Sequence, residues 1–133
     1  MASPTEKTRK GVYLRDGHRC VTCGNPTTLE FQHRRRVGAG GSKILPAPVD
    51  GLTLCHRHNR ECEAEMQTEA LRSGWKVRAW VRRPELVPVY YPLDRAWFRL
   101  EGLFRIEISR AVAMEMGCSV YGAEWLAWHE VIA

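Results

Sequence analysis

Two short pairs of potential metal ligands constrain this chain more than any other feature of its sequence. Cys20 and Cys23 form the first pair, and Cys55 and His58 form the second with the same spacing of two intervening residues. Two such pairs, about thirty residues apart, match the four tetrahedral ligands of a structural zinc site. Because a small domain gains much of its stability from such a site, we expect zinc to hold the N-terminal half together.

The cysteine content favours bound metal over disulfides. The chain has five cysteines, and an odd number cannot pair completely within one chain. Paired spacing suits thiolate ligands in a reducing compartment. His56 and Cys62 are alternatives to His58 as the fourth ligand. Outside such a role, we expect Cys62 and Cys118 to be small buried hydrophobic residues.

Length and hydropathy limit the architecture. A chain of 133 residues fits one domain with a modest core. It lacks the apolar run of about eighteen residues that a membrane span needs, and residues 1–7 lack the apolar stretch of a signal peptide. We therefore expect a cytoplasmic protein without a membrane partner, and the oligomeric state stays open.

Basic residues gather in the half of the chain that carries the ligand pairs. Through Arg60 there are eleven Lys or Arg and four Asp or Glu, whereas the remainder has nine basic residues, eleven acidic residues and all five Trp. A basic surface attracts a polyanion such as DNA. The first half is therefore the candidate nucleic-acid face, and the second half is expected mainly to pack.

Local patterns predict an α+β fold. In the first half they indicate a helix at 6–15, a strand at 27–33, a loop at 37–49, a strand at 50–55, and a helix from His56 that ends at Gly74. Further on they indicate a strand at 75–81, short strands around 87–89 and 97–100, and helices within 106–132. The segment from Ala113 to Leu126 loosely resembles a helix-turn-helix, but we favour a C-terminal packing element.

His33 is the candidate catalytic residue within the ligand frame. It ends a predicted strand and is followed by Arg34, Arg35 and Arg36. A histidine with a near-neutral pKa can take a proton from water, and an acceptor behind its ring fixes the tautomer.

Several motifs together carry a resemblance to a known family. In chain order they are Leu14-Arg15-Asp16-Gly17, Cys20-x2-Cys23-Gly24, Gln32-His33-Arg34, Gly40-Gly41, Asp50-Gly51-Leu52-Thr53-Leu54-Cys55 and Cys55-x2-His58-Asn59. This order resembles the HNH endonucleases of the zinc-containing ββα-metal (His-Me finger) type. Later motifs resemble the small HNH proteins of actinobacterial phages: Gly74-Trp75-x-Val77, Pro84-x3-Pro88-Val89 and Trp97-x2-Leu100. The resemblance spans residues 12–101.

The resemblance implies roles for individual residues. His33 would deprotonate the attacking water, Asp50 would orient His33, and Arg34 would contact phosphate. Gln32 and Asn59 would hold a catalytic Mg²⁺ or Mn²⁺, which stabilises charge on the scissile phosphate. The candidate DNA contacts are Arg34, Arg35, Arg36, Lys43, Arg57 and Arg60. Because Mg²⁺ prefers anionic oxygen ligands and both amides are neutral, we expect this ion to bind weakly.

Three functions fit these patterns. The first is a metal-dependent DNA endonuclease or nickase, contacting mainly the DNA backbone. The second is a zinc-stapled module that binds nucleic acid or a phage or host protein without cutting, and the third is an interaction adaptor. We expect an HNH-like ββα-metal core with its N-terminal helix at 1–74, a β-rich extension at 75–104, and a helical tail at 105–133.

Overall fold

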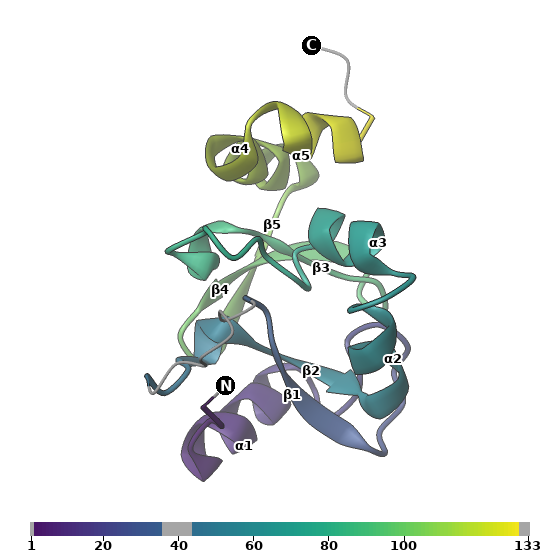
Figure 1. Cartoon of the computed structure of the whole chain (residues 1–133), viewed down its shortest axis with the longest axis vertical. Coiled ribbons are helices and arrows are strands. Elements are labelled where there is room, and N and C mark those ends of the chain that lie inside the picture. The colour runs from purple at the N-terminus through teal and green to yellow at the C-terminus, as the bar shows by residue number, and fades with distance from the viewer. Residues whose placement is uncertain (1, 36–43, 131–133) are drawn as a thin grey trace.

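The computed structural model describes residues 2–35 and 44–130. Within them the chain forms two small antiparallel sheets and five α-helices (Figure 1). In chain order the helices and strands are α1 (Glu6–Arg15), β1 (Leu29–His33), β2 (Gly51–Cys55), α2 (His56–Glu61), α3 (Gln67–Arg72), β3 (Val89–Tyr91), β4 (Ala96–Glu101), β5 (Phe104–Ile108), α4 (Arg110–Tyr121) and α5 (Ala123–Trp128). Short 3₁₀ turns span Pro48–Asp50 and Pro84–Leu86. The expected α+β class is therefore observed.

The first sheet is the β1–β2 hairpin, with α1 and α2 packed beside it. The register places Leu29 opposite Cys55 and His33 opposite Gly51. Thr5 caps the N-terminus of α1 through its side chain, and the helix covers the predicted residues 6–15. The local order strand, strand, helix was predicted correctly.

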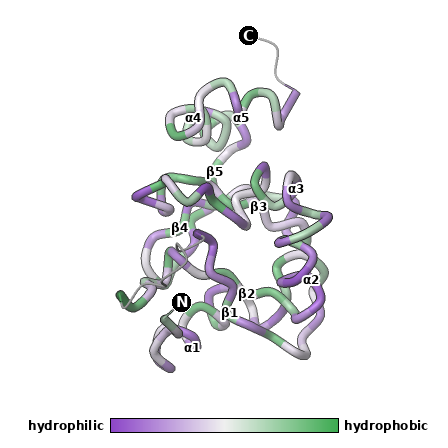
Figure 2. Tube along the Cα trace, in the orientation of Figure 1, coloured by the Kyte–Doolittle hydropathy of each residue, from purple (hydrophilic) through white to green (hydrophobic). Residues whose placement is uncertain are grey.

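The helix α2 is polar along its whole length. Every residue of His56–Glu61 is hydrophilic (Figure 2), and among them His58 is buried. A short helix without an apolar face gains little from core packing. Its position therefore depends on polar contacts, those of Cys55 and His58 at the predicted metal site and those of His56 and Asn59 with Glu30 on β1.

The second sheet, β3–β4–β5, lies between the β1–β2 hairpin and the α4–α5 pair (Figure 1). One buried cluster lies between the two sheets and includes Leu52, Leu54 and Phe98. A second cluster, including Trp97 and Trp125, lies under α4 and α5. The C-terminal helices are thus a packing element, as expected. No helix in the described ranges is both long enough and apolar enough to cross a bilayer.

A buried polar network joins α1 to both sheets. The Arg15 guanidinium donates hydrogen bonds to Asp16 and to the carbonyl oxygens of Pro48 and Gly51. Asp16 Oδ1 accepts a 2.6 Å hydrogen bond from the Tyr91 hydroxyl. Burial, followed by the nearby Asp16 charge, raises the pKa of Tyr91, so its hydroxyl keeps its proton. These hydrogen bonds hold α1 against β2 and β3, next to the four predicted metal ligands.

Three secondary-structure predictions were wrong. The expected helix from His56 to Gly74 is interrupted between α2 and α3, where Cys62 is fully buried and Met66 packs on the core. Packing of these side chains prevails over helix propensity. Residues 75–81 form no strand: Val77 makes an isolated β-bridge with Arg35, and the chain turns at residues 79–80. Residues 106–108, where a helix was expected, belong to β5, which pairs with β4. The helix α4 begins after the Ser109 cap.

Candidate metal centre and active site

Four predicted ligands come together in one cluster. The ligand atoms of Cys20, Cys23, Cys55 and His58 all lie within 4.8 Å of one another. The Cys55 Sγ to His58 Nδ1 distance is 3.3 Å, and the Cys23 and Cys55 sulfurs are 3.9 Å apart. Three thiolates and one imidazole are a donor set that suits a closed tetrahedral zinc site. The cluster can therefore hold a zinc-type metal ion.

Local structure explains why these side chains meet. The first pair lies in a tight turn, where the Gly24 amide donates to the Cys20 carbonyl at 2.8 Å. Gly24 has a φ of 80°, a conformation that glycine adopts without steric cost. Cys55 ends β2, and His58 lies in the first turn of α2. The turn therefore positions Cys20 and Cys23, and the junction of β2 with α2 positions Cys55 and His58. All four ligand atoms lie close together as a result.

The two alternative fourth ligands lie elsewhere. His56 Nδ1 contacts Glu30 Oε2 at 2.7 Å on the surface. Cys62 is fully buried in the core, where burial raises its thiol pKa to about 12. A thiol of this kind stays protonated at neutral pH and behaves as a small apolar residue. The preference for His58 as the fourth residue of the cluster agrees with the structure.

His33 lies at the end of β1, and its ring is partly exposed. It packs edge-on against Phe31, with the ring centroids 5.3 Å apart. Its Nε2 lies 2.9 Å from the backbone carbonyl oxygen of Ala2. A carbonyl only accepts, so Nε2 carries the proton in this arrangement and Nδ1 is the unprotonated nitrogen. The N-terminal segment therefore covers one side of the candidate base.

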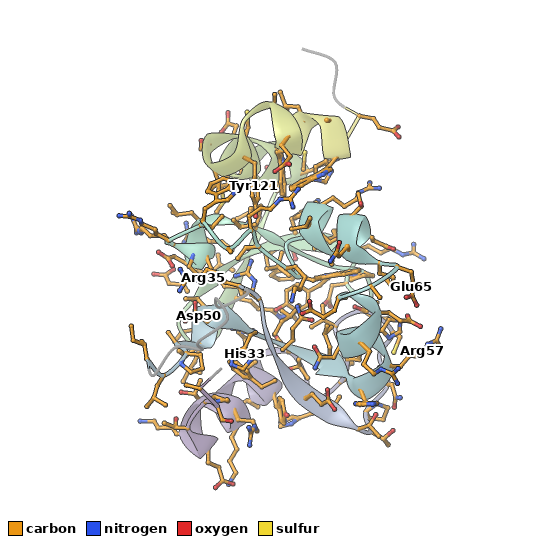
Figure 3. All side chains as sticks on the ribbon, viewed as in Figure 1. His33, Arg35, Asp50, Arg57, Glu65 and Tyr121 are labelled. Carbon is orange, nitrogen blue, oxygen red and sulfur yellow. The ribbon has the colours of Figure 1, made fainter. Side chains whose placement is uncertain are left out.

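Two hollows meet at His33. The smaller one has a volume of about 100 Å³ and is also lined by Arg35 and Asp50. Figure 3 shows His33, Arg35 and Asp50 on the same side of the molecule. Asp50 Oδ2 accepts the Ala47 amide at 2.8 Å, so its carboxylate also closes the preceding 3₁₀ turn. Asp50 and His33 thus line the same hollow.

The larger hollow has a volume of about 480 Å³ and contains a carboxylate that sequence reasoning missed. It is lined by both His33 and Asn59, together with Glu30. Asn59 Nδ2 donates to Glu30 Oε1 at 2.7 Å. This hydrogen bond, reinforced by His56, holds the pKa of Glu30 below its ordinary value of 4.5. Glu30 was detectable in the sequence as the only acidic residue in the predicted strand at 27–33.

Gln32 does not reach this hollow, which corrects its predicted role as an ion ligand. Its side chain is 1% exposed, and Nε2 donates to the Trp75 carbonyl at 2.6 Å. Successive residues of a strand point to opposite faces, so the neighbour of His33 turns into the core. Its buried Oε1 has no hydrogen-bond partner among the described residues.

Arg34 is also internal, which corrects its predicted role as a phosphate contact. The side chain is fully buried, and its guanidinium donates to four backbone carbonyls, those of Gly74, Val49, Pro84 and Val87. Burial lowers its pKa to about 10, so the group remains charged at neutral pH. It joins segments that are far apart in the chain and is not accessible to DNA.

The other predicted DNA contacts have different surroundings. Arg35 is half-buried and donates to the Val81 carbonyl at 3.1 Å. Arg57 is exposed and pairs with Glu61 at 2.9 Å, and Figure 3 shows it on the outer side of α2. Arg60 is exposed on the same helix. Arg36 and Lys43 lie outside the described residues.

Comparison of this chain with protein-family models, with curated proteins and with solved structures found no match.

Proposed function

We propose that this chain is a metal-dependent DNA endonuclease or nickase of the HNH type, with His33 as the general base. One observation carries the proposal: His33 and Asn59 line a single hollow beside a hairpin and helix joined by the Cys20, Cys23, Cys55 and His58 cluster. Strand, strand, helix and a zinc-compatible cluster in this order are the parts that the sequence resemblance implies.

The proposed base is held by its neighbours on β1. Phe31 packs against the imidazole edge, and the strand pairing with Gly51 fixes the backbone beneath it. The imidazole would accept the proton of a water molecule that attacks the phosphodiester. With the proton on Nε2, the nitrogen that accepts is Nδ1; if the N-terminal segment moves away, Nε2 can serve instead.

Glu30 and Asn59 are the residues in this hollow that would hold a divalent ion. The carboxylate supplies the anionic oxygen that Mg²⁺ prefers, and the amide nitrogen of Asn59 orients it. A Mg²⁺ or Mn²⁺ ion bound there would stabilise negative charge on the phosphate. We therefore propose Glu30, in place of Gln32, as a ligand of the catalytic ion.

Basic residues at the mouth of the two hollows would contact the DNA backbone. Arg9 lines the larger hollow and Arg35 the smaller one, and Arg60 is exposed on α2. Contacts of this kind give affinity with little sequence specificity. We propose Arg9 in place of the buried Arg34.

A second candidate is a zinc-stapled module that binds DNA or a protein without cutting. The burial of Gln32 favours it, because the residue next to the candidate base is unavailable as a ligand. The side chain of Asn59, the other residue that the sequence suggested as an ion ligand, already donates a hydrogen bond to Glu30. In this reading the hollow beside His33 is a binding surface only.

Nicking of supercoiled plasmid in Mg²⁺ or Mn²⁺ tests the proposal. Wild type should nick, and His33→Ala should lose nearly all activity while it keeps its zinc content. Glu30→Gln should require a higher Mg²⁺ concentration, because its carboxylate is lost. His18→Ala is the matched control, since His18 is exposed and lines neither hollow.

Two outcomes contradict the proposal. Undiminished cutting by His33→Ala would remove His33 as the base. If neither protein cuts but both bind DNA with a steep dependence on salt, the chain is a binding module and not a nuclease.

A chain that lacks residues 1–4 adds a further comparison, because removal of the Ala2 carbonyl should expose His33 Nε2 and raise the nicking rate.

A further inference from the structure

A large groove lies on the part of the molecule that the proposed nuclease site does not use. It has a volume of about 730 Å³ and runs between α3, the β3–β4 turn and the start of α4. Figure 1 shows α3 and the α4–α5 pair on the side of the second sheet away from β1 and β2. Among the described residues, none lines both this groove and either hollow at His33. Its size is in the range of small-molecule sites.

Three arginines from distant segments meet at this groove. Arg72 ends α3, Arg95 lies in the β3–β4 turn, and Arg110 begins α4. Within the part of the chain that the structure describes, none of their guanidinium groups has a carboxylate within ion-pair distance. Nearby arginines differ, because Arg78 pairs with Glu124 and Arg105 pairs with Asp94. The groove therefore presents positive charge that is free to meet an anion.

Aromatic side chains also border the groove: Tyr90 is half-exposed, whereas Trp97 and Trp75 are buried beneath the surface. Trp97 lies 5.3 Å from Tyr90 and 5.7 Å from His129, measured between ring centroids, and Trp75 lines the same surface. The Nε2 atom of His129 is buried without a hydrogen-bond partner among the described residues. Aromatic rings and Arg planes are the groups on which nucleic-acid bases stack.

Two carboxylates at the groove narrow the chemical class of ligand that the groove can bind. Glu69 and Glu107 line it together with the arginines. Carboxylates repel a bare anion but accept hydrogen bonds from sugar hydroxyls and base amino groups. A ligand that carries both phosphate and such donors suits this lining better than inorganic phosphate does.

We propose that this groove binds a nucleotide unit, with its phosphate at Arg72, Arg95 and Arg110 and its base toward the half-exposed Tyr90. The nucleotide could be free in solution or part of a single-stranded nucleic acid, and both share this chemistry. The site stands independently of the proposed nuclease function.

Fluorescence anisotropy of the full chain with a labelled oligoriboadenylate of about twelve residues, which carries both base amino groups and sugar hydroxyls, tests this site. The triple variant Arg72→Ala, Arg95→Ala, Arg110→Ala should bind about tenfold or more weakly, and its log–log salt slope should fall by about 2. The matched control is Arg19→Ala, Arg82→Ala, Arg83→Ala, which removes the same charge from exposed positions outside the groove. The control should bind like wild type, and all chains should share one melting temperature.

Competitors identify the source of the nucleotide. Displacement by unlabelled adenosine monophosphate indicates a free nucleotide, and displacement by unlabelled oligoriboadenylate alone indicates a single strand. The proposal is overturned if the wild type does not bind, if both triple variants bind equally, or if inorganic phosphate competes as well as the monophosphate. Plasmid nicking is measured on the same triple variants, so loss of nicking and loss of groove binding are separate results.

Discussion

Arg34 shows how the role of one charged side chain depends on where it lies. In the sequence it follows the candidate base and has the features of a phosphate contact. In the structure it is fully buried and donates to four backbone carbonyls from separate segments. A buried cation of this kind holds loops that lack regular hydrogen bonding.

Replacement of Arg34 tests this structural role. We expect Arg34→Ala to lower the free energy of unfolding by about 3–5 kcal/mol, because four carbonyls lose their donor at once. Urea unfolding measures the change, with exposed Arg82→Ala as a control that should change stability little. Unchanged stability together with weaker DNA binding would restore Arg34 as a phosphate contact.

His129 gives a second prediction at the scale of the residue. Burial, and then the charges of Arg72 and Arg110, lower its pKa from 6.5. The unfolded chain therefore takes up this proton first, so stability is full above pH 6.5 and falls as pH drops from there toward the lowered pKa. His129→Gln should lose less stability than wild type between about pH 7 and pH 5. Melting temperatures across this range, with NMR titration of the His129 ring, check the expectation; a ring that titrates at or above 6.5 would contradict it.

At the scale of the element, the α4–α5 pair depends on close packing at one glycine. A Cβ at Gly117 would collide with the Trp125 ring, which is fully buried. The same ring stacks on Tyr121, at 6.0 Å between centroids. These contacts hold α4 against α5, and the contact of Trp125 with Trp97 on β4 packs the pair against the second sheet.

Substitution of this glycine should disturb the pair. Gly117→Ala is expected to cost about 1–3 kcal/mol through overpacking, in spite of the better helix propensity of alanine. Thermal unfolding and tryptophan fluorescence would report the change. Ala111→Ser, on the exposed face of α4, should have little effect, and a more stable Gly117→Ala chain would show that the helices can move apart freely.

At the scale of the whole molecule, the candidate metal cluster connects three segments of the N-terminal half. It links the Cys20–Cys23 turn, the end of β2 and a wholly polar α2. Since a ligand set of this kind forms only in the folded chain, metal binding adds directly to folding stability.

Loss of the metal should therefore unfold the N-terminal half. We expect wild type to hold one zinc ion per chain and Cys20→Ser to hold none and to melt at least about 10 °C lower. Atomic absorption and calorimetry measure both quantities. Cys118→Ser should keep the metal, because Cys118 lies outside the cluster. A Cys20→Ser chain with an unchanged melting transition would exclude a structural metal.

The sequence by itself determined the features that depend on spacing along the chain. The four residues of the metal cluster, the order hairpin then helix, and the helix at 6–15 all follow from local patterns, because turns, strands and helix caps are set by neighbouring residues. The position of His33 at the end of a strand was predictable for the same reason.

Only the tertiary structure decided which polar side chains face solvent and which face the core. Gln32 and Arg34 flank His33 in the chain but point into the interior, whereas Glu30 lines the hollow with His33 and Asn59. The groove at Arg72, Arg95 and Arg110 likewise comes from three segments that no local pattern connects. Burial is set by contacts between distant segments, so a sequence motif can identify candidate residues while the fold determines which of them share a surface.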